Sequence, residues 1–215
     1  MKTNMVWSTA ALVLVIGAAA PANAQIRGDI GPLVGYYQPF GHFEPATVYS
    51  TSLPREPNDL RGVAWGAVGH LTFGRRLGME GQLASASSTI PGIITPAGPR
   101  GPTTARVMIA TLLGQYDVSP VPERMRLWLS AGPGLVQHGG SAYKSYGSPV
   151  SLGVAFGAGI ALPIASELQV TAGATAVRYT LDVKMPPELQ GNSGSLEHGT
   201  RTDAVIHLGL RWGQL

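Results

Sequence analysis

The chain has 215 residues, no Cys, and a formal net charge of only +3. This small surplus gives no support for the basic surface of a nucleic-acid-binding protein, and the lack of Cys excludes disulfides, thiolate metal sites and a cysteine nucleophile. Charged residues make up 13% of the chain, against about 25% in typical soluble proteins. The polar surface of an ordinary soluble enzyme is therefore missing.

The first 24 residues have the pattern of a secretory signal peptide. Lys2 precedes an almost wholly apolar run over residues 5–20, and Pro21 is followed by Ala22-Asn23-Ala24. We expect cleavage after Ala24, which makes residues 1–24 a signal peptide and residues 25–215 the exported domain. The alternative is a single membrane anchor, but the run is short for a span of about 20 residues.

The exported part alternates between apolar and small or polar residues with the period of two that is typical of β-strands. Residues 103–116 are ambiguous because positions 107–110 are apolar on both faces; we expect Val107 and Ile109 to point outward with Ala105 and Leu113, and Arg106 to point inward. Eight segments show the pattern: 30–37, 63–73, 77–84, 103–116, 126–135, 150–162, 168–175 and 203–212.

The connections between these segments are alternately long and short. Long ones cover residues 38–60, 88–102, 138–149 and 182–200, and short ones cover 75–76, 119–124 and 163–166. This is the plan of a bacterial outer-membrane barrel, with long outer loops and short periplasmic turns. The sequence predicts an all-β, eight-stranded, antiparallel up-and-down transmembrane β-barrel with both ends in the periplasm.

Two other architectures have to be weighed against this barrel. A secreted soluble ligand-binding barrel has the same strand count, but its outer face needs charged residues, and the only Lys after the signal peptide, Lys144 and Lys184, lie in predicted loops. Helical spans are disfavoured because the uncharged stretch 145–166 contains two Pro and regularly spaced Gly. A membrane barrel is compatible with uncharged strands, since lipid surrounds its outer face, and with regularly spaced Gly, since small residues fit its lumen.

Four segments carry a resemblance to a known group. They are GHLTFGRRLGMEGQL (69–83), LSAGPGLV (129–136), FGAGIALP (156–163) and AVIHLGLRW (204–212). The chain resembles small outer-membrane β-barrel proteins of the OmpA/OmpX type over its whole exported length. The resemblance implies a Gram-negative outer-membrane location and a porin-like barrel, and it lies in the pattern rather than in functional residues.

The resemblance also implies a partner for the last strand. In this family the barrel-assembly machinery reads a terminal aromatic residue preceded by alternating apolar residues. Trp212 and the residues Leu210, Leu208 and Ile206 match that signal, although the chain continues for three residues beyond the aromatic. We expect a monomer in contact with outer-membrane lipid and lipopolysaccharide.

An eight-stranded barrel is just wide enough for side chains to fill its interior. Buried charges must pair, so we expect a polar network in the lumen that plugs the barrel. The alternative is a narrow channel or a lipid-handling barrel. We expect the network to comprise Glu80, Arg126, Asp203, His207 and Arg211, within a wider inward set that adds Asp29, His70, Gln82, Arg106, Gln169 and Thr171.

Aromatic residues are expected at the two membrane interfaces. Tyr36 and Trp65 face outward near the outer interface, and Phe73 and Trp212 face outward near the inner one. From Trp65 to Phe73 the strand rises roughly 20 Å at a tilt near 40°, which is close to the apolar band of about 25 Å.

The sequence offers no catalytic, metal or cofactor site. Asp203 and His207 lie about 13 Å apart on one strand face, too far for the orienting hydrogen bond of a Ser–His–Asp triad with Ser130. The five His, including His138, are scattered, and we expect the loop ones to be solvated. Glycine runs are not followed by a helix start, so phosphate binding is disfavoured.

The outer loops are the expected place for function, because loops on a rigid scaffold usually carry it. Phe40, Phe43 and Tyr49 lie in the first loop, and the third combines Lys144 with Tyr143 and Tyr146. The sequence therefore predicts a non-enzymatic outer-membrane barrel with a role in envelope structure or surface interaction, including an extracellular ligand at these loops. Arg178, outward-facing near the outer rim, is a candidate for a lipid phosphate.

Overall fold

The computed structural model describes residues 26–40, 61–90, 94–95, 98–99, 102–120, 125–141, 150–183 and 197–213. The signal peptide predicted over residues 1–24 lies outside them. Within the described residues, no helix has both the length and the apolarity to cross a membrane. The strands are β1 (Ile26–Phe40), β2 (Gly62–Phe73), β3 (Leu77–Ile90), β4 (Ile94–Thr95), β5 (Gly98–Pro99), β6 (Thr103–Asp117), β7 (Arg126–Gly139), β8 (Val150–Ala165), β9 (Leu168–Val183) and β10 (Glu197–Gly213).

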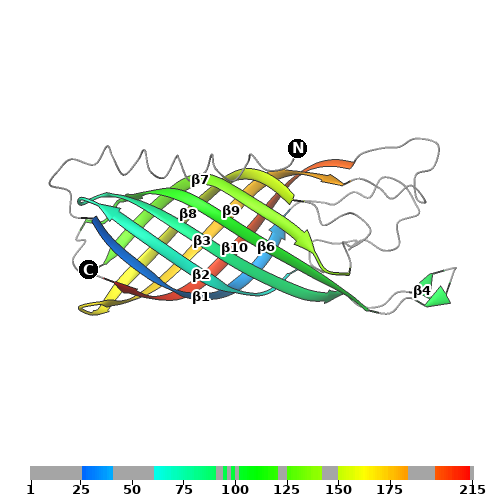
Figure 1. Cartoon of the computed structure of the whole chain (residues 1–215), viewed down its shortest axis with the longest axis horizontal. Coiled ribbons are helices and arrows are strands. Elements are labelled where there is room, and N and C mark those ends of the chain that lie inside the picture. The colour runs from blue at the N-terminus through cyan, green and yellow to red at the C-terminus, as the bar shows by residue number, and fades with distance from the viewer. Residues whose placement is uncertain are drawn as a thin grey trace, which may run out of the picture.

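Eight long strands form one closed antiparallel barrel, and β4 and β5 pair separately outside it (Figure 1). The order around the barrel is β1-β10-β9-β8-β7-β6-β3-β2, so each strand pairs with its neighbour in the chain and β1 pairs with β10 to close the wall. The strands tilt across the barrel axis, as closure requires (Figure 1). The predicted closed eight-stranded barrel is confirmed.

The two ends of the barrel differ. The turn end carries the connections after β2, β6 and β8 together with the start of β1 and the end of β10 (Figure 1). The loop end carries the four longer connections, at residues 41–61, 91–102, 140–149 and 184–196. Several strands extend further toward the loop end than the sequence pattern predicts, because β7 continues to Gly139 and β9 to Val183.

The alternation of residue types decides which side chains face the lumen. On β8, Leu152, Val154 and Phe156 are exposed on the outside, whereas Ser151 and Ala155, at alternate positions, are buried. A pleated strand points successive side chains to opposite faces, so the apolar set covers the barrel exterior and the small set lines its interior.

Strand β6 corrects one prediction. Val107, Ile109 and Leu113 are buried in the lumen, whereas Arg106 is exposed on the outside. The prediction that Arg106 points inward is therefore wrong, and so is the outward prediction for Ala105, Val107, Ile109 and Leu113. Both faces of β6 are apolar near its middle, so the sequence pattern does not decide the phase of the strand, that is, which alternate residues face the lumen. The space to be filled inside the barrel decides which set points inward.

Two strand pairs are interrupted at a Gly–Pro step. Gly31 and Pro32 of β1 have no partner on β10, and Gly132 and Pro133 of β7 have none on β6, although both steps pair fully with their other neighbours. Proline has no N–H to donate to a ladder. These two seams divide the wall into two four-stranded halves, β10-β9-β8-β7 and β6-β3-β2-β1.

Glycines inside the barrel make room for larger neighbours. A Cβ on Gly159 would lie 2.4 Å from the Trp128 ring, and one on Gly173 would lie 3.0 Å from His207 Nε2. The small inward residues of β8 and β9 therefore accommodate the large inward residues of β7 and β10. Such interlocking fills the lumen at the density of a protein interior.

Candidate functional site

The lumen near the turn end contains a group of buried ionic residues centred on Arg211. Its Nη2 donates a hydrogen bond of 3.0 Å to Glu80 Oε2, and its Nη1 lies 3.6 Å from Asp29 Oδ1. The guanidinium carbon also lies 5.1 Å from the centre of the Trp128 ring. One buried cation thus faces two carboxylates and an aromatic ring, so its charge is compensated inside the barrel.

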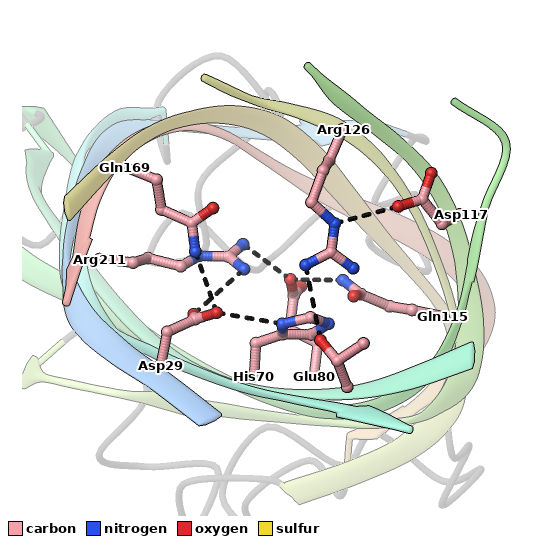
Figure 2. Close-up of polar contacts among 9 residues, drawn as sticks. Asp29, His70, Glu80, Gln115, Asp117, Arg126, Gln169 and Arg211 are labelled. Carbon is pink, nitrogen blue, oxygen red and sulfur yellow. Dashed lines mark hydrogen bonds and ion pairs between the residues drawn. The ribbon is translucent and has the colours of Figure 1, made fainter. Parts of the chain in front are cut away.

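Further side chains contact these two carboxylates (Figure 2). Gln115 Nε2 donates to Glu80 Oε2 at 2.7 Å, and Gln169 Nε2 donates to Asp29 Oδ2 at 3.0 Å. His70 Nδ1 lies 3.2 Å from the same Asp29 oxygen. The residues come from β1, β2, β3, β6, β9 and β10, so the network joins strands from all sides of the barrel.

A second ion pair lies beside the first. Arg126 Nε donates to Asp117 Oδ2 at 3.0 Å, and the other carboxylate oxygen of Asp117 accepts hydrogen bonds from the backbone N–H and hydroxyl of Ser119. We call the residues labelled in Figure 2 the turn-end cluster: Asp29, His70, Glu80, Gln115, Asp117, Arg126, Gln169 and Arg211.

Only a small hollow remains beside the turn-end cluster. Its volume is about 10 Å³, which is about the space of one water molecule. Arg76 and Trp128 line it together with members of the cluster. The hollow has no room for a substrate or cofactor.

A second group of buried polar residues lies in the lumen toward the loop end. Tyr179 Oη donates to Asp203 Oδ2 at 2.7 Å and lies 3.2 Å from His138 Nε2, with the two rings 5.9 Å apart. Tyr37 and Arg201 are buried there as well. We call Tyr37, His138, Tyr179, Arg201 and Asp203 the loop-end cluster.

The lumen between the two clusters is filled by apolar and uncharged polar side chains. Along β10, His207 and Val205 are buried between Arg211 and Asp203, and along β9 Thr171, Thr175 and Val177 are buried between Gln169 and Tyr179. Thr175 Oγ1 donates to Gln82 Oε1 at 2.9 Å. A contiguous core packs through this part of the lumen and includes two tyrosines of the loop-end cluster. It is formed by Leu33, Tyr37, Ala64, Val68, Ala84, Ala86, Ala105, Val107, Ile109, Leu113, Val136, Ala155, Val177, Tyr179, Leu181 and Val205.

The five residues predicted to form a lumen network are all in the lumen, but they do not lie in one network. Glu80, Arg126 and Arg211 belong to the turn-end cluster, whereas Asp203 belongs to the loop-end cluster. His207 is buried between the clusters and packs against Gly173. Tertiary packing therefore divides the expected network into two parts.

Several lumen residues were missed by the sequence analysis. Gln115 and Asp117 were missed because the phase of β6 was inverted; an inward Asp117 opposite Arg126 was the available signal. Arg201 lies beyond the predicted start of the last strand. The prediction that His138 is a solvated loop residue is wrong, because β7 continues past it and buries it completely.

The geometry of the described residues shows no catalytic triad and no metal site. Ser130 Oγ makes no hydrogen bond, and Asp203 bonds to Tyr179 rather than to His207. The described part of the chain contains no group of three or more His, Asp or Glu placed to hold a metal ion. The arrangement offers packing and charge compensation, not an activated nucleophile.

The outer face of the barrel is mostly apolar. The residues predicted as interface aromatics all point outward: Trp65 is 62% exposed, Tyr36 and Trp212 are exposed, and Phe73 is half-buried. Other exposed outward residues include Ile30, Val34, Val63, Leu83, Leu129, Leu152, Phe156, Ile206 and Leu208. A barrel with an apolar exterior and a packed interior is the fold class of transmembrane β-barrels.

Comparison with solved structures places this fold among small outer-membrane barrels. Neisserial surface protein A (NspA) aligns with 86% of this chain and 96% of its own, at a TM-score of 0.52 and 10% identity. OprG from Pseudomonas aeruginosa aligns with 87% of this chain and 93% of its own, at a TM-score of 0.51 and 15% identity. Outer membrane protein W from E. coli aligns with 88% of this chain and 98% of its own, at a TM-score of 0.50 and 16% identity.

These likenesses concern the fold, because the sequence identities are low. No protein-family model matches the sequence, and no curated protein sequence is significantly similar to it. The fold is that of small eight-stranded outer-membrane β-barrels, as the resemblance to the OmpA/OmpX type implied.

Proposed function

We propose that this protein is a non-enzymatic barrel of the bacterial outer membrane, with a role in envelope structure or surface interaction. A signal peptide over residues 1–24 directs export, and residues 25–215 form the barrel. The observation that carries the proposal is the apolar outer face of a closed barrel. Exposed apolar side chains on all eight long strands need lipid around them, which argues against a secreted soluble barrel.

The filled lumen supports a structural role over transport. The turn-end cluster and the packed core beyond it occupy successive levels of the interior, and the hollow beside the cluster is about the size of one water molecule. Ions crossing the barrel would have to break the Glu80–Arg211 pair and then displace closely packed side chains such as Val68, Leu113 and Val177, which are almost completely buried. The narrow channel is therefore the less favoured alternative.

The partners follow from the same placement. Outer-membrane lipid covers the outward strands, and the barrel-assembly machinery reads Trp212 at the end of β10. We assign surface interaction to the connections at the loop end. Phe40 ends β1 and is exposed, but the other predicted loop residues, Phe43, Tyr49, Tyr143, Lys144 and Tyr146, lie outside the described residues. The barrel acts as a monomer, and no nucleic acid or cofactor is involved.

Heat modifiability tests the proposal. The exported domain is refolded in detergent and compared on SDS gels with and without boiling, alongside circular dichroism. A mobility shift on boiling and a β-rich spectrum are expected. A chain that stays soluble and monomeric without detergent contradicts the membrane barrel and makes a secreted ligand-binding barrel the leading reading.

Conductance across planar bilayers separates the structural role from the channel. The folded barrel is expected to give no steps above the leak of the bilayer. Steady cation or anion currents from heat-modifiable protein would establish the channel and contradict the structural role.

A further inference from the structure

The outward side chains at the loop end differ from those at the turn end. Toward the turn end, the outward residues of β3, β6, β9 and β10 are large and mostly apolar, such as Leu77, Tyr116, Val170 and Trp212. Toward the loop end, the outward residues of the same strands are hydroxyl-bearing or cationic. They are Ser87, Thr89, Thr104, Arg106, Arg178, Thr180, Thr200 and Thr202, and all are exposed except the half-buried Thr202.

Strand register gathers these residues into two patches. On β9 and β10, Arg178 pairs with Thr202 and Thr180 with Thr200, which defines the Arg178 patch. On β3 and β6, Arg106 pairs with Ser87 and Thr104 with Thr89, which defines the Arg106 patch. Going around the barrel in either direction, two strands separate the patches, so both lie on the outer face but on opposite sides of the barrel.

The arginine charges of both patches are not balanced by described acids. Arg178 forms no hydrogen bond or ion pair with the described residues, and Arg106 donates only from Nε, at 3.3 Å, to Ser85 Oγ. Among acidic residues with described side chains, Glu167 lies in a turn at the opposite end, and the others point into the lumen: Asp29, Glu80, Asp117 and Asp203. Each patch is thus a cation on the lipid-facing surface.

Each patch lies directly above an apolar strip. The next outward residues toward the turn end are Ala176 and Ala174 below Arg178, with Ile206 beside them, and Met108 and Ala110 below Arg106. A cation and hydroxyls above an apolar strip match an amphiphile whose headgroup carries phosphate and sugar hydroxyls. Arginine binds phosphate through two parallel N–H donors.

We infer that the Arg178 and Arg106 patches each bind a phosphate group of lipid A, the lipid part of lipopolysaccharide, in the outer leaflet. The inference rests on the proposed function, which puts the loop end at the cell surface. It deepens that proposal by assigning the lipid contact to two patches, with one lipid A at each. The acyl chains then lie along the apolar strips, and the glucosamine hydroxyls meet the Thr and Ser side chains.

A titration with fluorescent lipid A tests the inference. Wild-type protein, Arg178→Gln, Arg106→Gln and the double variant are folded in neutral detergent micelles, and binding is followed by anisotropy. We expect two lipid A molecules per wild-type barrel. Each single variant is expected to keep one site unchanged and to bind at the other about fivefold more weakly, the effect of one lost cation near a lipid surface.

Matched controls separate a phosphate site from general attraction. Arg75→Gln removes an exposed arginine from the turn between β2 and β3, and it should leave both sites unchanged. Arg178→Lys keeps the charge but not the two parallel donors, so it should bind lipid A more weakly than the wild type and more tightly than Arg178→Gln. Dephosphorylated lipid A should lose its affinity for both patches. Equal binding of dephosphorylated lipid A, or equal weakening by Arg75→Gln and the double variant, would overturn the inference.

Heat modifiability of each sample distinguishes the two levels of failure. If the wild-type chain forms no heat-modifiable barrel, both the proposed function and the lipid A inference, which rests on it, are wrong. If every variant folds and all bind lipid A as the wild type does, the barrel stands and the assignment of the patches is wrong.

Discussion

Arg211 shows how one residue holds several strands together. Its guanidinium faces carboxylates from β1 and β3 and lies against a Trp from β7, while its own side chain comes from β10. Only 2% of the side chain is exposed. Removal of one partner from a buried ion pair leaves a charge without compensation, which costs more than the pair itself contributes.

We therefore expect Arg211→Met to lower the free energy of unfolding by about 3–5 kcal/mol, because it leaves Glu80 and Asp29 buried without their cation. Urea unfolding in lipid vesicles, followed by the gel shift on boiling, measures the change. Arg75→Met, at an exposed turn, should change it by less than about 0.5 kcal/mol. An unchanged midpoint for Arg211→Met would show that the pair does not stabilise the lumen.

Glycine positions give a second residue-level prediction. Gly159→Ala would place a methyl group 2.4 Å from the Trp128 ring, so we expect a loss of about 1–3 kcal/mol in unfolding free energy from overpacking. Gly81→Ala is the control, because a Cβ there meets nothing within 4 Å. The same urea titration compares them, and equal stability of the two variants would contradict a closely packed lumen.

At the level of elements, the two Gly–Pro steps make two of the eight strand seams weaker than the rest. Pro32 lies at the β1–β10 seam and Pro133 at the β6–β7 seam, and neither can donate to its partner strand. Each step still pairs with the strand on its other side. The wall therefore consists of two four-stranded sheets joined along interrupted ladders.

Hydrogen exchange followed by mass spectrometry should reveal these seams. We expect residues 208–211 of β10 and 111–114 of β6, which face the prolines, to exchange faster than residues 171–174 of β9, which have uninterrupted partners on both sides. Unpaired ladder groups open locally at a lower free-energy cost. Uniform protection in all three segments would show that the interruptions have no dynamic consequence.

The whole molecule is asymmetric from end to end. Short connections mark the turn end, whereas long connections, together with outward Arg, Ser and Thr on β3, β6, β9 and β10, mark the loop end. A bacterial outer membrane has a matching asymmetry, with phosphorylated glycolipid on its outer side. The orientation that satisfies both puts the loop end at the cell surface.

Single-cysteine labelling tests this orientation, since the natural sequence has no Cys. A membrane-impermeant maleimide should label Ser141→Cys, at the loop end, on intact cells. It should label Arg75→Cys, in the turn between β2 and β3, only after the outer membrane is permeabilised. The reverse labelling pattern would contradict the proposed orientation.

Most of the fold could be predicted from local pattern. A period of two identifies strands, and on β8 and β10 the contrast between apolar and small residues is strong enough to decide which side chains face lipid. Alternating long and short connections then give an up-and-down order, because neighbouring strands joined by short turns must be antiparallel. Trp212 and Trp65 are placed on the outside by the same rule.

The sequence by itself determined the strand count, the connectivity and the apolar exterior, since these depend on residue type and spacing along the chain. Only the tertiary structure decided the phase of β6, the burial of His138 and the division of the lumen charges into two clusters. These depend on which side chains from distant strands meet at one height of the barrel. That height is set by the register of all eight strands together, and no local pattern contains it.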